Sequence, residues 1–145
     1  MISCTRKLTF EAGHRIHGKD YNGKCKSPHG HSYKVFVHAS VNSDVLNELG
    51  MVVDFGVIKQ LLGTWIDENW DHSFICDEND AEMIKALKNF NDVPKVYLIP
   101  YNSTAENLAK YLLHDVCNEL FKGMGITIYK IDIWETENCY ATAEI

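Results

Sequence analysis

Three histidines are spaced as ligands of one metal ion. His29 and His31 lie in a segment that alternates in polarity, so the segment is predicted to be a β-strand and both rings project from one face. His14 ends the preceding alternating segment and comes opposite the pair if the two strands form a hairpin. Three neutral histidines with one open position are typical of catalytic zinc. The alternative is that they are ordinary core or surface histidines, as we expect for His17, His38 and His114.

Cys25 lies four residues before His29, between Lys24 and Lys26. Two lysines and a nearby dication would favour its thiolate form. That thiolate could be a fourth ligand that closes the metal site. It could instead be a catalytic base or nucleophile held just outside the coordination shell. The spacing alone leaves both interpretations open.

Two acidic residues are further candidates. In Asp71-His72 the carboxylate could fix the imidazole tautomer and raise its basicity, although adjacent residues seldom bond each other directly. Glu135 follows Ile131 and Ile133 on one face of a predicted strand, and a buried carboxylate needs a partner. A ligand with two adjacent N–H groups would supply that partner. Otherwise Glu135 faces water at an edge.

Two hairpins and the helices between them must position these residues. Strict alternation predicts strands over Cys4–His14 and about His29–Val41. Asp54 is a predicted N-cap, followed by apolar residues at helical spacing as far as Ile66. The segment Ser103–Glu106 is a predicted capping box that opens a second amphipathic helix.

The rest of the chain completes an α+β domain. We expect an irregular stretch at 69–79, a short helix from about 79 to 89, a short strand at Val96–Ile99, and strands at about 126–136 and 140–144. This order predicts one domain over residues 1–145, an antiparallel four-stranded sheet with helices packed on one face. Because such a sheet has two free edges, we expect an oligomer in which sheets join edge to edge.

The composition narrows the class of protein. The chain has 145 residues, 46% of them hydrophobic, and a net charge of -6. This acidic balance argues against nucleic acid as a partner. No apolar run could span a membrane, and the first residues do not resemble a secretory signal. Five scattered cysteines, an odd number, indicate reduced thiols in the cytoplasm.

Five segments together resemble one family over nearly the whole chain. They are Phe10-Glu11-Ala12-Gly13-His14, Cys25-x-x-x-His29-Gly30-His31-Ser32-Tyr33, Asp71-His72, Ser103-Thr104-Ala105-Glu106-Asn107 and Trp134-Glu135-Thr136. The set is similar to the 6-pyruvoyl-tetrahydropterin synthase and 6-carboxytetrahydropterin synthase family of the tunnelling fold. Three residues between the cysteine and the His-Gly-His segment resemble the bacterial 6-carboxytetrahydropterin synthases of queuosine biosynthesis. Trp70 and Trp134 depart from the family pattern and bear on pocket shape.

The resemblance implies a role for each candidate residue. His14, His29 and His31 would be the Zn²⁺ ligands and Cys25 the proton acceptor. Asp71 and His72 would relay protons, Glu135 would anchor the pterin, and Thr104 would lie beside the pterin pocket. The implied assembly is a barrel, commonly within a hexamer, with active sites at subunit interfaces.

The implied activity is that of a zinc-dependent lyase. It would convert 7,8-dihydroneopterin triphosphate to 6-carboxy-5,6,7,8-tetrahydropterin with release of triphosphate and acetaldehyde. No external nicotinamide is needed, in keeping with a chain that has no GxGxxG segment. Arg15, Lys24 and Lys26 could meet the triphosphate or be solvated loop residues. The alternatives are a 6-pyruvoyl-tetrahydropterin synthase and a non-catalytic module that binds zinc or pterin.

Overall fold

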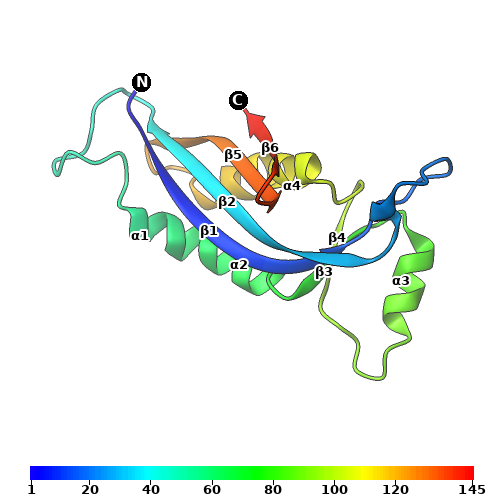
Figure 1. The fold of residues 1–145 in the computed structure, drawn as a ribbon. Helices are drawn as coiled ribbons and strands as arrows, with labels where there is room; N and C mark the ends of the chain where they lie inside the picture. The colour runs from blue at the N-terminus through cyan, green and yellow to red at the C-terminus, as the bar shows by residue number, and fades with distance from the viewer.

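The computed structural model describes residues 1–145 and contains one curled six-stranded sheet (Figure 1). The strands are β1 (Ser3–His14), β2 (His29–Val41), β3 (Ser73–Asp77), β4 (Val96–Ile99), β5 (Ile126–Thr136) and β6 (Cys139–Glu144). Their order in the sheet is β4-β3-β1-β2-β5-β6. The pairs β1–β2, β2–β5 and β5–β6 are antiparallel, whereas β3 runs parallel to both β1 and β4.

The prediction of the sheet is therefore correct for its four antiparallel strands and wrong in the total number of strands, which is six. The four antiparallel strands are present, and the short strand at Val96–Ile99 is confirmed as β4. The missed strand is β3, in the stretch expected to be irregular. Four of its five residues are buried, so it lacks the polar alternation that marks a strand with one face in water.

Helices cover one face of the sheet. The first helical run consists of α1 (Phe55–Ile58), η2 (Lys59–Gly63) and α2 (Thr64–Asn69), and the last of α4 (Ala105–Tyr111), η3 (Leu112–Cys117) and α5 (Asn118–Leu120). Each run continues through a π-helical middle section. Their apolar stripes share one core with the inward side chains of the sheet, including Ile58, Leu62, Ile66, Leu108, Leu112, Val35, Val37, Ile131 and Ile133.

The predicted helix starts are confirmed at Asp54 and shifted at Ser103. Asp54 caps the first run, because its carboxylate accepts a hydrogen bond from the Gly56 amide at 2.7 Å. Thr104 rather than Ser103 caps α4, and its hydroxyl accepts from the Asn107 amide at 3.1 Å. The capping box is thus wrong by one residue. The Ser103 side chain is instead fully buried.

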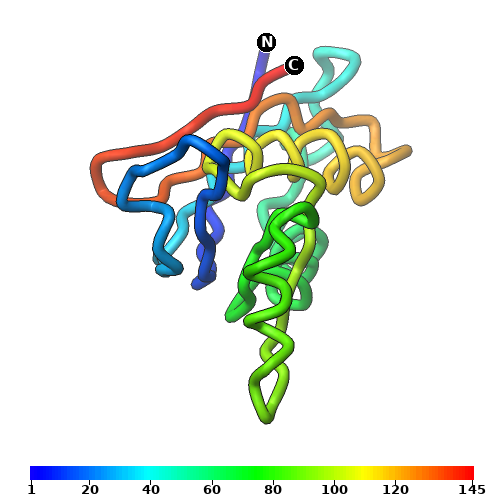
Figure 2. The backbone as a smooth tube through the Cα atoms, turned by 90° about the vertical axis from the view of Figure 1, so that its right-hand side faces the viewer, coloured from blue at the N-terminus to red at the C-terminus, as the bar shows by residue number.

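The hairpin of β1 and β2 runs along the length of the molecule (Figure 1). Both termini lie on the upper side of the molecule in Figures 1 and 2, the N-terminus beside the end of β2 and the C-terminus at the tip of β6. The short helix α3 (Ala81–Lys88), predicted at about 79–89, lies near the end opposite the N-terminus, and the loop after it protrudes. None of the helices is long and apolar enough to cross a lipid bilayer.

Candidate metal centre and active site

The hairpin brings the three predicted histidine ligands together. In the β1–β2 ladder His14 pairs with His29, and Ala12 pairs with His31. Gly30 lies between the two histidines of β2, and a Cβ atom there would come within 3.3 Å of the Ala12 carbonyl. A glycine at this position therefore lets the two strands approach closely where the histidines converge.

The three rings converge on one point. One nitrogen from each ring belongs to a group in which all ligand atoms lie within 4.8 Å of one another. The Nε2 atoms of His14 and His29 are 3.1 Å apart, and the ring centroids of His14 and His31 are 5.0 Å apart. A tetrahedral zinc ion with bonds of about 2.0–2.1 Å requires ligand nitrogens separated by about 3.3 Å. The separation of the His14 and His29 nitrogens is close to this value, and the His31 nitrogen lies within 4.8 Å of both.

Backbone carbonyls hold two of the rings from behind. The Nδ1 atom of His14 is 2.6 Å from the Ser103 carbonyl, and that of His29 is 2.6 Å from the Ser27 carbonyl. Because a carbonyl only accepts, each Nδ1 is the protonated nitrogen and each Nε2 presents a lone pair. Two lone pairs that face each other at 3.1 Å, beside a buried and unpartnered His31 Nε2, are satisfied by a cation. The residues present therefore fit a zinc ion.

Burial favours the neutral form that metal binding requires. It lowers the pKa of His14 to about 4, with smaller effects in the same direction from His29 and His31, although the Ser103 hydrogen bond acts the other way. Burial followed by the charge of His29 also lowers the pKa of His31. Both imidazoles are thus ready to bind a cation near neutral pH.

Glu135 faces the same cluster from β5. Its two carboxylate oxygens lie 3.9 Å from His14 Nε2 and 3.9 Å from His31 Nε2. Burial, and then the charge of Glu106, raise the pKa of Glu135, while His29 lowers it. Of the two orientations that the sequence left open for Glu135, the structure has the one toward the cluster, and the carboxylate is half-buried.

Cys25 lies in the short turn η1 (Lys24–Lys26) and is half-buried. Its carbonyl accepts a hydrogen bond from the Ile16 amide at 2.8 Å, which ties the turn to the chain just after His14. The metal-ligand group comprises the three histidines without the Cys25 sulfur. This arrangement favours the interpretation of Cys25 as a residue outside the coordination shell.

Asp71 and His72 bond each other directly. The Asp71 carboxylate accepts from His72 Nδ1 at 2.8 Å and from the Glu11 amide at 2.9 Å. This geometry is reached because His72 has a left-handed backbone, with φ of 57°. The His72 side chain is 77% exposed, and in the sheet β1 separates it from the strand of His29 and His31. His72 lies outside the group of three histidine ligands, although it lines with His31 an open cavity of about 340 Å³.

The remaining candidates have structural partners. The hydroxyl of Thr104 caps α4, next to the residue whose carbonyl holds His14. Arg15 binds Asp80 through two nitrogens, one at 2.6 Å, so its charge is already paired. His17 contacts Asp77 at 2.8 Å, and His38 contacts Asp132 at 2.7 Å.

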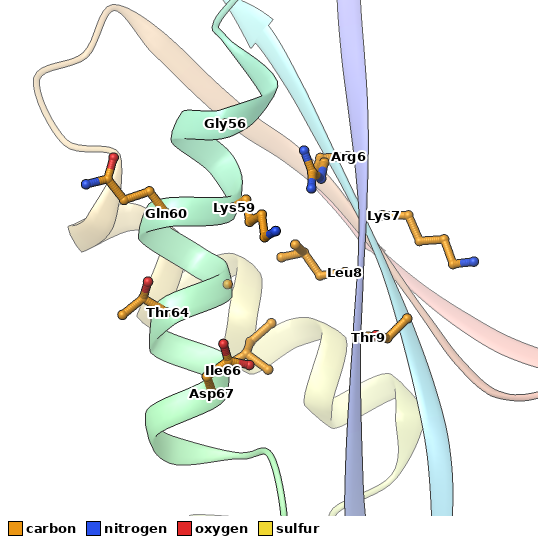
Figure 3. Close-up of a pocket in the computed structure, with 11 residues that line it drawn as sticks. Arg6, Lys7, Leu8, Thr9, Gly56, Lys59, Gln60, Thr64, Ile66 and Asp67 are labelled. Carbon is orange, nitrogen blue, oxygen red and sulfur yellow. The ribbon is translucent and has the colours of Figure 1, made fainter.

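A larger cavity lies away from the histidines. It has a volume of about 570 Å³ between β1 and the first helical run (Figure 3). Its lining is mostly polar and includes Arg6, Lys59, Gln60, Thr64 and Asp67, whereas the Lys7 side chain points away from the helix. No histidine or cysteine lines it, so it offers none of the chemistry predicted from the sequence.

Two features of the site escaped sequence reasoning. The Ser103 and Ser27 carbonyls are backbone groups, which any residue would supply, so no side-chain pattern marks them. The second is Tyr33, which lies two residues after His31 on β2 and whose ring lies 5.4 Å from that of His31, measured between centroids. Its hydroxyl is buried without a partner, and burial raises its pKa well above the ordinary value. The HxHxY spacing could have indicated that it lies beside the cluster.

Comparisons with known proteins agree with this geometry. The sequence model of the family described as 6-pyruvoyl tetrahydropterin synthase matches residues 3–145. A protein of Rickettsia bellii named 6-carboxy-5,6,7,8-tetrahydropterin synthase is 43% identical over 141 residues, covering 97% of this chain and 98% of its own. The Rickettsia felis protein of the same name is 41% identical over 140 residues, with the same coverage.

A solved structure shows the same fold. The 6-pyruvoyl tetrahydropterin synthase of Caenorhabditis elegans superimposes with a TM-score of 0.70 at 25% identity, covering 99% of this chain and 95% of the other. The matches of sequence and of fold each cover nearly the whole chain. The chain therefore belongs to the 6-pyruvoyl tetrahydropterin synthase family of enzymes.

Proposed function

We propose that the protein converts 7,8-dihydroneopterin triphosphate to 6-carboxy-5,6,7,8-tetrahydropterin, releasing triphosphate and acetaldehyde, in a pathway to queuosine. The observation that carries the proposal is the three-histidine cluster with a facing carboxylate and without a sulfur ligand. The choice of product is supported by relatives at 41% and 43% identity that bear the 6-carboxy name.

His14, His29 and His31 would hold the zinc ion. A zinc ion bound there supplies a Lewis acid that lowers the pKa of hydroxyl groups on the substrate side chain. The Ser103 and Ser27 carbonyls keep the rings of His14 and His29 in the orientation that this requires.

The chain's own residues would then bind the pterin and move protons. Glu135 accepts hydrogen bonds from the amino group and the ring N–H group of the pterin, one through each carboxylate oxygen. Cys25 takes a proton from the substrate side chain as a thiolate. His72 acts as the second acid or base, with its Nδ1 proton held by Asp71 so that Nε2 faces the substrate. Thr104 lies beside the pterin subsite.

The proposal includes an assembly of several copies, as a hexamer in the cytoplasm. The exposure of the His72 side chain and its position across β1 support a site completed by a second copy of the chain. The sheet supports edge-to-edge joining, because β6 has one neighbour and β1 pairs with β3 only at Ala12 and Gly13.

Product identification tests the proposed reaction. Zinc-loaded protein is incubated with 7,8-dihydroneopterin triphosphate, and the products are analysed by mass spectrometry. We expect a 6-carboxy pterin together with acetaldehyde. A 6-pyruvoyl product would support the activity named for the C. elegans protein instead. Unchanged substrate would favour a non-catalytic binding module.

A further inference from the structure

Tyr33 carries a buried hydroxyl that makes no hydrogen bond. The residue is 1% exposed, and its Oη is one of four buried side-chain atoms without a partner. A hydroxyl that loses water on folding and gains no partner destabilises the folded chain. An unsatisfied group of this kind in a native structure therefore calls for an explanation.

Such atoms gather at the histidine cluster. Besides Tyr33 they include His31 Nε2, which is a predicted metal ligand, and the hydroxyl of Ser103, whose carbonyl holds His14. The fourth, Trp70 Nε1, lies in the aromatic core, where its ring contacts that of Trp65 at a centroid distance of 5.4 Å. Three of the four thus surround one site, as expected if a bound molecule supplies their partners.

The ring of Tyr33 is held firmly beside this site. It stacks on Phe10 with centroids 4.7 Å apart and an angle of 8° between the ring planes. Its centroid lies 5.4 Å from that of His31 and 6.1 Å from that of His14. The β2–β5 ladder pairs Lys34 with Trp134, so the next residues along, Tyr33 and Glu135, are cross-strand neighbours on one face.

The two neighbours have complementary chemistry. The carboxylate of Glu135 can only accept hydrogen bonds, whereas the phenol of Tyr33 can donate one. The pyrimidine edge of a pterin presents an amino group, a ring N–H and a carbonyl oxygen in a row. Glu135 can receive the two N–H groups, which leaves the carbonyl beside them in need of a donor.

We infer that the Tyr33 hydroxyl donates a hydrogen bond to the ring carbonyl of the bound pterin. The inference rests on the proposed function and adds a substrate-binding residue to it. Tyr33 then contributes to substrate selection, because a ring without an acceptor at this position would leave the hydroxyl unpaired.

The test compares Tyr33→Phe with Tyr97→Phe. The Tyr97 hydroxyl is hydrogen-bonded to that of Tyr111 at 2.6 Å in the aromatic core. Its removal therefore breaks a hydrogen bond that is present in the folded chain. For both variants we would measure zinc content, urea unfolding of the metal-free protein, and calorimetric affinity for 7,8-dihydroneopterin. This probe lacks the triphosphate leaving group and is not consumed. The wild-type protein is measured first.

For Tyr33→Phe we expect unchanged zinc content, a urea midpoint equal to or above that of the wild type, and affinity reduced about tenfold. Tyr97→Phe should lower the urea midpoint and leave the affinity unchanged. The inference is overturned if Tyr33→Phe binds as tightly as the wild type, or if its urea midpoint falls as far as that of Tyr97→Phe. Failure of the wild type itself to bind the probe would count against the proposed function and remove the basis of the inference.

Discussion

The Nε2 atoms of His14 and His29 face the same point because each ring is held from behind. Rotation of either ring would break its 2.6 Å hydrogen bond to a backbone carbonyl. The Ser103 carbonyl belongs to the loop before α4, 89 residues along the chain from His14. Metal binding at His14 therefore depends on the packing of α4 as well as on the hairpin.

Replacement of Cys25 tests whether its thiolate is a proton acceptor or a zinc ligand. We expect Cys25→Ala to reduce turnover by at least about 100-fold, because a positioned acid–base group contributes that much. Its zinc content should stay at the wild-type value, since the three histidines form the ligand group without the sulfur. Turnover and zinc stoichiometry are measured together, with the exposed Cys139→Ala as the control. Loss of zinc from Cys25→Ala would make the thiolate a ligand.

Glu135 tests the pterin anchor. Glu135→Gln keeps the size of the side chain and removes its charge, so KM should rise at least about tenfold because charge-assisted hydrogen bonds are lost. The control is Glu137→Gln, in which the exposed carboxylate contacts Lys34 instead. Steady-state kinetics at constant zinc content separate the two. An unchanged KM for Glu135→Gln would show that Glu135 has another role.

At the scale of elements, an ion pair joins the end of β1 to the start of α3. Arg15 follows His14 and binds the Asp80 carboxylate, which also caps α3 through the Met83 amide. Burial would raise the pKa of Asp80, but the hydrogen bonds from Arg15 and from this amide hold it below its usual value. The stabilisation is therefore present above about pH 4 and is lost as the pH falls through the folded-state pKa.

Asp80→Asn should lower the free energy of unfolding at pH 7 by about 1–3 kcal/mol, because a charged hydrogen-bond acceptor is lost. The difference from the wild type should shrink below about pH 4. Urea unfolding at both pH values measures it. Glu82→Gln, which alters an exposed contact to the same arginine, should change little. An equal deficit at both pH values would contradict this account.

The elements differ in how far the sequence predicts them. Strict alternation in Cys4–His14 and His29–Val41 predicted the hairpin and hence the convergence of His14 with His29. The strand β3 was missed because burial of most of its residues removes the alternation. The start of α4 was placed at Ser103 because Glu106 follows it at capping-box spacing, whereas the neighbouring Thr104, an equally good cap by residue type, caps the helix.

The residues of the candidate site also differ in how far the sequence predicts their arrangement. The convergence of His14, His29 and His31 follows from their spacing along the predicted hairpin. The direct Asp71–His72 hydrogen bond was considered unusual because adjacent residues seldom make one, and in the structure His72 has a left-handed φ of 57°. The unpartnered hydroxyl of Tyr33 depends on what the other strands place around it, so a sequence read strand by strand does not reveal it.

At the scale of the whole molecule, the exposed His72 lies outside the group of His14, His29 and His31. If active sites form between copies, Cys25→Ala and His72→Ala chains should each be inactive alone. Mixed and reassembled, they should regain part of the wild-type turnover, because some sites then combine an intact Cys25 with an intact His72. Turnover after mixing, with sedimentation to define the assembly, measures this. No recovery in an intact mixed assembly would place both residues of a site in one chain.

The coordination of zinc tests the central claim most directly. X-ray absorption at the zinc edge of the loaded wild-type protein reports the number and kind of ligand atoms. We expect one zinc per chain with three imidazole nitrogens and lighter, oxygen-type ligands, and no sulfur at about 2.3 Å. A sulfur ligand, or fewer than three imidazoles, would show a site closed by Cys25 or built from other residues. Either result would contradict an open catalytic centre formed by His14, His29 and His31.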